Sequence, residues 1–208
     1  MRCVIIAGSP DADADFIRDH VGRDDFVICA DRGYDHARSA GIEPQLIVGD
    51  FDSCAVLPPE DSEVVRLRVR KDDSDTRVCA RIAVERGFRD IVILAATGGR
   101  LDHTFANICV LDYLASTGAR AGILSKNETV TLLTEGSYTF ENQSGKTFSL
   151  FPFGVERAVA SIENAEYPAS RFEFLCSRTL GLSNVFKENC RITVHGGRLL
   201  MMINNKDG

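Results

Sequence analysis

The first 125 residues alternate short apolar runs, rich in β-branched residues, with longer segments of helical periodicity. This alternation restricts the possible folds more than any other feature of the chain. Nearly all-apolar strands separated by helices are typical of a parallel, doubly wound α/β sheet that helices cover on both faces. Ligands of such sheets bind beyond the carboxyl ends of the strands. The strands that we expect span residues 3–7, 26–30, 46–48, 64–67, 91–95 and 121–124.

Apolar residues at helical spacing mark two of the intervening helices. Val78 and Ile82 begin one pattern, which lies before Gly87. The clearer pattern follows residue 100 and predicts a helix that covers the sheet. We expect its buried face to consist of Leu101, Phe105, Ile108, Leu111 and Ala115.

After Lys126 the pattern changes to short β-rich segments, several of which alternate polar and apolar residues. Ile192 and Val194, for example, are predicted to point inward while their polar neighbours point outward. Turn signals separate the segments, and the pattern predicts a small antiparallel β-sandwich. Its expected strands are 129–134, 137–141, 147–151, 158–162, 171–175, 191–195 and 199–203. The sequence thus predicts two closely joined domains, residues 1–125 and 126–208.

The composition argues against several classes of protein. The 208 residues are 44% hydrophobic and 26% charged, as in globular proteins that bury a core. A net charge of −6 argues against non-specific binding to nucleic acid or to anionic membranes. The first apolar run is strand-length and lacks the pattern of a secretion signal. The seven cysteines are odd in number and show no C-x-x-C spacing, which favours a cytoplasmic protein without disulfides.

Two carboxylates follow the apolar run 46–48, in the segment Gly49-Asp50-Phe51-Asp52-Ser53. Residues two apart in an extended segment point the same way, so Asp50 and Asp52 are predicted to leave the strand end on one side. Like charges this close repel each other unless a cation lies between them, and a divalent metal with oxygen ligands is the usual partner. An acidic turn is the competing interpretation. Two further acidic clusters after comparable hydrophobic signals argue against it.

A second acidic cluster, residues 71–76, reads Lys-Asp-Asp-Ser-Asp-Thr and stands at the start of a predicted helix. Asp and Ser are common helix caps, and carboxylates suit the positive end of the helix dipole. Capping needs only one or two such groups, whereas this segment supplies three carboxylates and a lysine. Its residues are therefore candidates both for capping and for site chemistry.

The third cluster, residues 97–103, reads Thr-Gly-Gly-Arg-Leu-Asp-His and lies between a predicted strand and a predicted helix. Adjacent glycines let a backbone approach a ligand closely, so the N–H groups of Gly98 and Gly99 are candidates for binding phosphate oxygens. Arg100 can donate two parallel hydrogen bonds to a phosphate. Asp102 adds a carboxylate to these donors, whereas His103 taken alone favours a structural or capping role.

Together the clusters predict an enzyme that binds a metal-bound nucleotide or phosphate ester, with carboxylates holding Mg²⁺ and an arginine holding phosphoryl oxygens. The chain has no G-x-x-x-x-G-K-[ST] loop, which excludes a standard P-loop protein. Two alternatives stay open. One is a metal-dependent phosphohydrolase acting on nucleotides, and the other is a non-catalytic nucleotide-binding module.

The same segments resemble motifs of the thiamine pyrophosphokinase (thiamine diphosphokinase) family. Residues 41–53, G-I-E-P-Q-L-I-V-G-D-F-D-S, are similar to that family's block G-I-x-P-D-x-x-x-G-D-F-D-S. Shorter similarities follow in order along nearly the whole chain. They comprise A-D-R-G at 30–33, K-D-D-S-D at 71–75, G-G-R-L-D-H at 98–103 with A-N at 106–107, and S-N at 183–184.

The resemblance implies transfer of pyrophosphate from ATP to the hydroxyl of thiamine, which releases AMP. It also implies an α/β catalytic domain for ATP and Mg²⁺ over residues 1–125 and a β-sandwich domain for thiamine and dimerisation over residues 126–208. The expected assembly is a homodimer with active sites between subunits. Matched to the motifs, Asp50, Asp52 and Asp75 would hold the metal and the ATP phosphates and thus be catalytic. The other implied residues are Asp102 in catalysis, Lys71, Asp72, Gly98, Gly99, Arg100 and His103 at ATP, and Asp31, Ser183 and Asn184 at the substrate.

Three residues depart from the family's motifs. Arg32 stands where glycine is frequent, Gln45 replaces the usual Asp, and Ser74 replaces the usual Thr. None of these positions is a carboxylate assigned to the metal. The departures therefore bear on the expected substrate contacts more than on the expected reaction.

Overall fold

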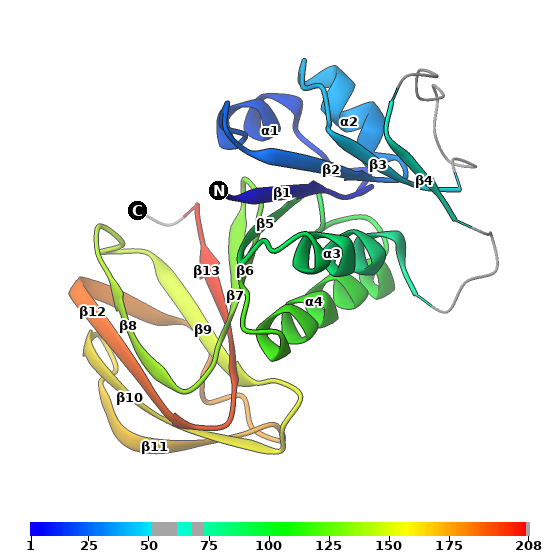
Figure 1. Ribbon diagram of the computed structural model, residues 1–208. Coiled ribbons are helices and arrows are strands. Elements are labelled where there is room, and N and C mark those ends of the chain that lie inside the picture. Colours follow the sequence, from blue (N-terminus) through cyan, green and yellow to red (C-terminus); the bar gives the residue numbers. More distant parts are fainter. Residues whose placement is uncertain (51–61, 68–72, 207–208) are drawn as a thin grey trace. The chain divides into compact units, whose positions relative to one another are not determined.

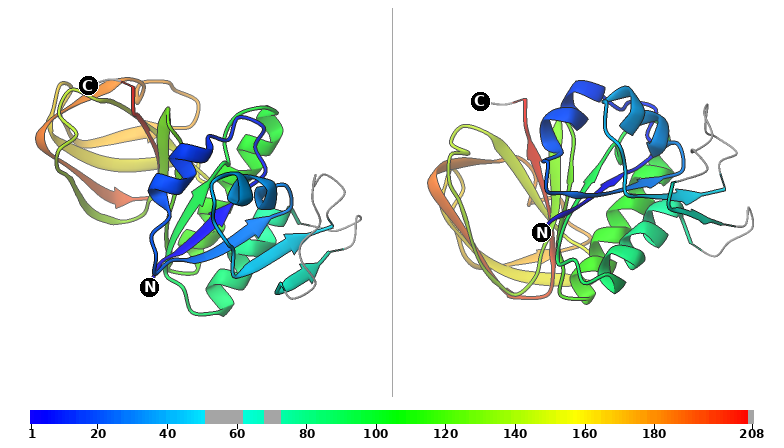
Figure 2. Two further views of the ribbon diagram at one scale, coloured as in Figure 1. Left: turned by 90° about the horizontal axis from the view of Figure 1, so that it is seen from above. Right: turned by 45° about the horizontal axis from the view of Figure 1, so that its top comes forward.

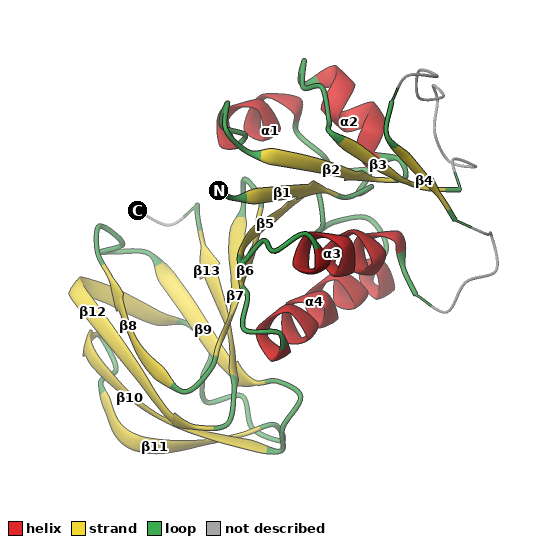
Figure 3. Ribbon diagram, in the orientation of Figure 1, coloured by secondary structure: helices red, strands yellow, loops and turns green. Residues whose placement is uncertain are grey.

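The computed structural model describes residues 1–50, 62–67 and 73–206. The chain divides into two compact units, Met1–Ser125 and Lys126–Gly208 (Figure 1). Among the described residues, every helix belongs to the first unit, and the second unit consists of strands and loops (Figure 3).

The first unit is built on a parallel sheet with the strand order β4-β3-β2-β1-β5-β6. The central strand β1 pairs on both sides, with Cys3 opposite Phe26 of β2 and Ile91 of β5. This arrangement confirms the predicted doubly wound sheet. Its strands are β1 (Cys3–Ile6), β2 (Phe26–Ala30), β3 (Leu46–Gly49), β4 (Val64–Arg66), β5 (Asp90–Leu94) and β6 (Arg120–Leu124).

Helices cover both faces of this sheet, α1 and α2 on one side and α3 and α4 on the other (Figure 1, Figure 2). The core under α1 and α2 includes Val4 and Ile6 of β1, Ile17 of α1 and Tyr34 of α2. Because both faces are covered, all residues of β1 are buried, which explains why the strand has no polar position. The helices are α1 (Ala14–His20), α2 (Gly33–Ser39), α3 (Asp75–Glu85) and α4 (Leu101–Ser116).

The buried face of α4 differs from the sequence prediction. Ile108 and Leu111 are buried as expected, but Leu101 and Phe105 are 81% and 57% exposed. The first turns of α4 border a cavity, and the buried part of the helix starts at Ile108. The apolar spacing therefore identified the helix correctly, but only in part its buried face: Ala115 is half-buried, and Val110 and Leu114 are buried although they were not predicted to be.

The second unit is an antiparallel sandwich whose two sheets share β12. One sheet has the order β11-β10-β12-β8, and the other has the order β12-β9-β13-β7. Both contribute to one core, in which the rings of Phe148 and Phe186 have centroids 4.2 Å apart. The strands are β7 (Glu128–Leu133), β8 (Gly136–Phe140), β9 (Thr147–Pro152), β10 (Arg157–Ala165), β11 (Ala169–Leu175), β12 (Asn184–Gly196) and β13 (Leu199–Asn204).

The alternation predicted for β12 is confirmed, since Ile192 and Val194 are buried while Arg191 and His195 are exposed. The strand is longer than expected, because it begins at Asn184. The Ser-Asn motif therefore lies at the start of a long central strand. No helix in the described ranges is long and apolar enough to cross a membrane.

Candidate active site

A cavity of about 620 Å³ opens at the carboxyl ends of β1, β2 and β5 in the first unit. The strand order reverses here, because β2, β3 and β4 lie on one side of β1 while β5 and β6 lie on the other. Doubly wound sheets bind ligands at such a reversal. Six of the predicted site residues line this cavity together: Asp31, Asp75, Gly98, Arg100, Asp102 and His103.

Asp31 enters the cavity from the end of β2 in an unusual backbone conformation. Its φ is +47°, in the left-handed region that residues with a side chain rarely adopt and that is often found at functional sites. Its N–H donates to the Val48 carbonyl at 2.7 Å, which ties the end of β2 to β3. Gly49 lies so close that a Cβ there would be 3.0 Å from the Asp31 Cα. Asp50 comes next in the chain, so two predicted carboxylates stand at neighbouring strand ends.

Asp75 borders the same cavity from the first turn of α3. The Ser74 hydroxyl caps this helix by accepting a hydrogen bond from the Arg77 N–H at 3.3 Å. Ser74 supplies the cap, and Asp75 lines the cavity, where it is half-buried. Asp73 is exposed and does not line the cavity. The structure thus places Asp75, the carboxylate that the family motif singles out, at the cavity and Asp73 away from it.

The glycine turn after β5 is closed by side chains of the protein. Gly98 donates its N–H to the Thr104 hydroxyl at 3.2 Å, and Gly99 donates its N–H to the Asp11 carboxylate at 2.9 Å. A Cβ at Gly98 would lie 2.3 Å from this carboxylate, and a Cβ at Gly99 would lie 2.5 Å from Pro10. The glycines therefore make room for the loop after β1. We expected their N–H groups to face phosphate oxygens, and in this structure they bond within the protein.

Arg100 and Asp102 pair with each other at the cavity wall. Arg100 Nε donates to Asp102 Oδ1 at 3.1 Å and Arg100 Nη2 to Asp102 Oδ2 at 2.6 Å. The carboxylate also accepts a hydrogen bond from the His103 N–H at 3.0 Å. The Arg100 guanidinium holds the pKa of the Asp102 carboxyl below its usual range. While the pair persists, Asp102 is an ionised and weak base.

Ser9 and Asn107 hold the loops around the cavity, and the sequence patterns predicted no role for them. The Ser9 hydroxyl donates to the Thr97 carbonyl at 2.6 Å, which links the loop after β1 to the glycine turn. The Asn107 amide donates to the Ala96 carbonyl at 2.8 Å and holds α4 to the end of β5. Ser9 follows the apolar strand β1, and that position was the signal that could have marked it. Asn107 lies within α4, and the A-N motif at 106–107 was the signal for it.

Carboxylates are the metal-binding groups that this site offers. Asp31 and Asp75 line the cavity, and Asp50 stands at the neighbouring strand end. Carboxylate oxygens are ligands that Mg²⁺ prefers, so the donor chemistry fits the expected ion. Within the described ranges, no three His, Cys, Asp or Glu residues come together in a group that could hold a metal. The other predicted residues of these clusters, Asp52, Lys71 and Asp72, lie outside the described residues.

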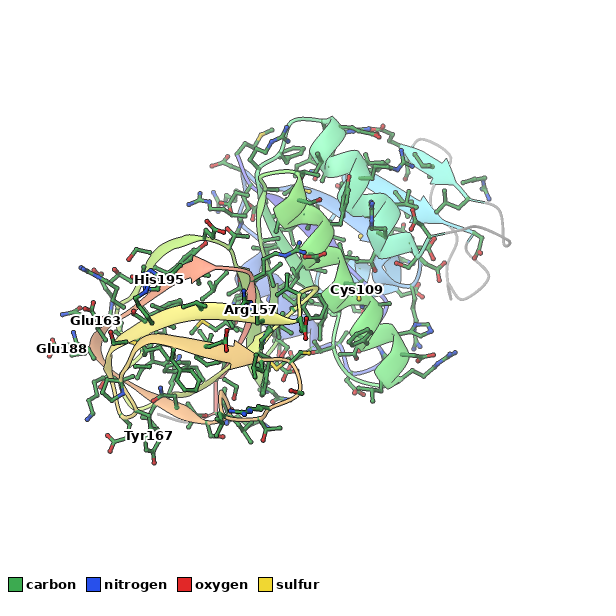
Figure 4. The ribbon with its side chains drawn as sticks, turned by 90° about the horizontal axis from the view of Figure 1, so that it is seen from below. Cys109, Arg157, Glu163, Tyr167, Glu188 and His195 are labelled. Carbon is green, nitrogen blue, oxygen red and sulfur yellow. The ribbon has the colours of Figure 1, made fainter. Side chains whose placement is uncertain are left out.

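The second unit carries a groove of about 330 Å³ with a more apolar lining. Tyr167, Phe172, Leu180 and Leu182 line it and are exposed. The Tyr167 side chain points away from the sandwich (Figure 4). An exposed cluster of aromatic and aliphatic side chains around a groove is suited to binding an organic ring.

Asn184 is buried at one side of this groove and holds Tyr167 in place. Its amide nitrogen donates to the Tyr167 carbonyl at 2.8 Å, and its amide oxygen accepts from the Tyr167 N–H at 3.0 Å. Ser183 is exposed beside it with φ +58°, and its N–H donates to the Ser149 hydroxyl at 3.1 Å. Asn184 thus shapes the groove, while the Ser183 side chain is accessible.

Two family models match the chain. Residues 17–122 match thiamin pyrophosphokinase, catalytic domain, and residues 137–199 match thiamin pyrophosphokinase, vitamin B1 binding domain. The thiamine pyrophosphokinase of Bacillus subtilis (strain 168) is 26% identical to the chain over 214 residues, which cover 98% of each protein.

Solved structures of similar proteins have the same fold. The crystal structure of thiamine pyrophosphokinase from Bacillus subtilis has a TM-score of 0.86 and 23% identity, and the match covers 98% of this chain and 99% of that one. For thiamin pyrophosphokinase from Geobacillus thermodenitrificans the TM-score is 0.83 with 27% identity, and the coverage is 98% and 97%. Because the catalytic-domain model alone spans more than half of the residues, the chain belongs to the thiamin pyrophosphokinase family.

Proposed function

We propose that this enzyme, a thiamine diphosphokinase by its family, binds ATP in the cavity of the first unit and thiamine at the groove of the second. The reaction transfers pyrophosphate from ATP to the thiamine hydroxyl and gives thiamine diphosphate and AMP. The observation that carries the proposal is the convergence of Asp31, Asp75, Arg100 and Asp102 on one cavity at the reversal point of the sheet. The family matches do not favour a phosphohydrolase or a non-catalytic module.

The charges around the cavity suit a metal-bound polyphosphate. Asp50, Asp52 and Asp75 are the proposed ligands of Mg²⁺, and Asp31 offers another carboxylate at the same sheet edge. When bound, Mg²⁺ supplies charge neutralisation and Lewis acidity. The other proposed contacts of ATP are Lys71, Asp72, Gly98, Gly99, Arg100 and His103.

Arg100 and Asp102 are proposed to act as a positioning pair. The thiamine hydroxyl is a poor nucleophile, so catalysis depends on its alignment with the β-phosphorus and on support for the developing charge. Arg100 can support that charge with two parallel hydrogen bonds if it turns from Asp102 to the phosphate. The arginine lowers the pKa of Asp102 while the two are paired, so Asp102 then orients Arg100. Once Arg100 turns to the phosphate, Asp102 is the proposed acceptor of the hydroxyl proton.

The groove of the second unit has the chemistry that thiamine requires. The thiazolium ring carries a permanent positive charge, and the faces of aromatic rings attract such cations. Tyr167 and Phe172 supply these faces. Ser183 is a proposed hydrogen-bonding contact, and Asn184 supports the groove through its bonds to the Tyr167 backbone.

We further propose a homodimer with active sites between subunits and a cytoplasmic location. The family motifs imply the homodimer. A reducing compartment fits the free cysteines, of which Cys3, Cys29, Cys79 and Cys190 are buried. Burial raises the pKa of the Cys3 thiol to about 12, which keeps it protonated and unreactive.

Incubation of the purified protein with thiamine, ATP and Mg²⁺, followed by mass analysis of the products, tests the proposal. We expect thiamine diphosphate and AMP, and we expect chelation of the metal to stop their formation. ADP with thiamine monophosphate would contradict pyrophosphoryl transfer. Phosphate or pyrophosphate without a modified acceptor would indicate the hydrolase, and ATP binding without turnover would indicate the non-catalytic module.

A further inference from the structure

Arg32 is a charged residue of the cavity to which neither the motifs nor the mechanism gives a role. It follows Asp31 at the end of β2, precedes the first turn of α2 and is exposed on the cavity wall. The backbone of Gly8 packs against the start of the Arg32 side chain, since a Cβ at Gly8 would lie 3.2 Å from the Arg32 Cβ. Within the described part of the chain, the Arg32 guanidinium makes no hydrogen bond or ion pair. It is therefore a cation at the cavity wall whose donors have no partner among the described residues.

Three of the other donors expected to meet phosphate, Arg100 and the N–H groups of Gly98 and Gly99, are engaged within the protein. Arg100 is paired with Asp102 through two hydrogen bonds. The N–H groups of the glycine turn donate to the side chains of Thr104 and Asp11. A polyphosphate must displace these partners to use the donors, whereas the described structure holds no partner to displace at Arg32.

We propose that Arg32 binds the polyphosphate of the nucleotide, an inference that rests on the proposed ATP site. A guanidinium stays ionised at all relevant pH values and can donate two parallel hydrogen bonds to phosphoryl oxygens. Arg32 also offsets the carboxylates Asp31 and Asp75, which otherwise repel the nucleotide. Because the contact forms when ATP binds, its removal is expected to raise the KM for ATP and to leave kcat nearly unchanged.

Steady-state kinetics of Arg32→Ala in the full chain test the inference. We expect the KM for ATP to rise about tenfold, while the KM for thiamine and kcat stay within about twofold. Arg32→Lys keeps the charge but not the paired donors, so its KM for ATP should lie between those of the parent and of Arg32→Ala. Arg38→Ala is the matched control, because Arg38 is an exposed arginine of α2, the helix that Arg32 precedes, and does not line the cavity. The control should behave like the parent protein.

Competition experiments identify the part of the nucleotide that Arg32 contacts. Inorganic tripolyphosphate should inhibit Arg32→Ala about tenfold more weakly than the parent, while inhibition by adenosine should not change. If adenosine inhibited Arg32→Ala more weakly than the parent while tripolyphosphate inhibited both equally, the proposal would be overturned and Arg32 would lie at the nucleoside. An unchanged KM for ATP in the active variant would overturn it as well.

The proposed function and this inference fail in different ways. If the parent protein makes no thiamine diphosphate, the proposed function is wrong, and calorimetric binding of tripolyphosphate to the parent and to Arg32→Ala still decides the inference. Equal binding to both proteins would refute a phosphate contact. Binding that Arg32→Ala weakens would support the contact independently of turnover.

Discussion

Replacement of Asp75 by Asn tests whether the second acidic cluster does more than begin a helix. The change keeps the size of the side chain and removes its negative charge. Asp75 is half-buried at the cavity, while the cap of α3 comes from the Ser74 hydroxyl. The substitution therefore removes a charge from the site and leaves the helix cap in place.

The expected effects on rate and on stability have very different sizes. A metal ligand or electrostatic contact at the reaction centre is worth several kcal/mol in the transition state, and each ~1.4 kcal/mol is a tenfold change in rate. We therefore expect kcat/KM to fall about a hundredfold or more, with a higher requirement for Mg²⁺. The interaction of Asp75 with the helix dipole contributes roughly 0.3–1 kcal/mol to stability. Loss of this contribution alone lowers Tm by about 4 °C or less.

Asp73→Asn is the control for this experiment. Asp73 belongs to the same acidic segment, but it is exposed and does not line the cavity. Its replacement should leave kcat/KM within about threefold, which is well below the ~1.4 kcal/mol that a tenfold change represents. A catalytic role of Asp75 is refuted if Asp75→Asn melts like the parent and keeps kcat/KM within about threefold of the parent's. It is also refuted if both variants lose activity equally.

Three further predictions concern other parts of the molecule. Gly98→Ala should destabilise the protein by roughly 2–4 kcal/mol in denaturant unfolding, because a residue with φ +100° acquires a side chain that displaces the Asp11 carboxylate. Gly118→Ala, with φ +77° and nothing within 4 Å of the new Cβ, should cost less, and an equal cost would argue against the Asp11 contact. Tyr167→Ala should raise the KM for thiamine about tenfold at an unchanged KM for ATP, and equal changes in both would contradict a thiamine groove. The pKa of His36 is lowered mainly by burial and secondly by the Arg32 charge. The folded protein is therefore most stable, as far as His36 is concerned, above the unfolded pKa of about 6.5, and its stability falls as the pH drops below that value. Thermal melting of the parent and His36→Asn at about pH 7.5 and about pH 5.5 should show a smaller loss in the variant, and equal losses would exclude His36 as the cause.

The fold could be predicted from the sequence largely because its periodicities are local. The strand β2, for instance, coincides with the apolar run 26–30, and the alternation around Ile192 and Val194 gave the inward face of β12. The exposure of Leu101 and Phe105 could not be predicted in this way. Spacing shows that a helix has an apolar stripe, but the neighbours of each turn depend on where the sheet ends and the cavity begins.

The site could be predicted in its composition more than in its contacts. Asp31 after β2 and Asp75 and Asp102 in the first turns of α3 and α4 line one cavity, in the region where the motifs predicted a site. The hydrogen bond of Gly99 to Asp11 joins residues 88 positions apart, and no local pattern indicates it. Likewise, the pairing of Arg100 with Asp102 depends on rotamers that the sequence does not determine.

The three departures from the family's motifs have different structural meanings. Gln45 lies before β3, where its amide oxygen accepts from the Val27 N–H at 2.6 Å, at the amino ends of the strands and away from the cavity. Ser74 caps α3 with a hydroxyl that Thr would also supply. Arg32 is the departure that adds a charged side chain to the cavity wall. Since the first two substitutions keep a local structural function, Arg32 is the departure among the three that changes the charge of the proposed ATP site.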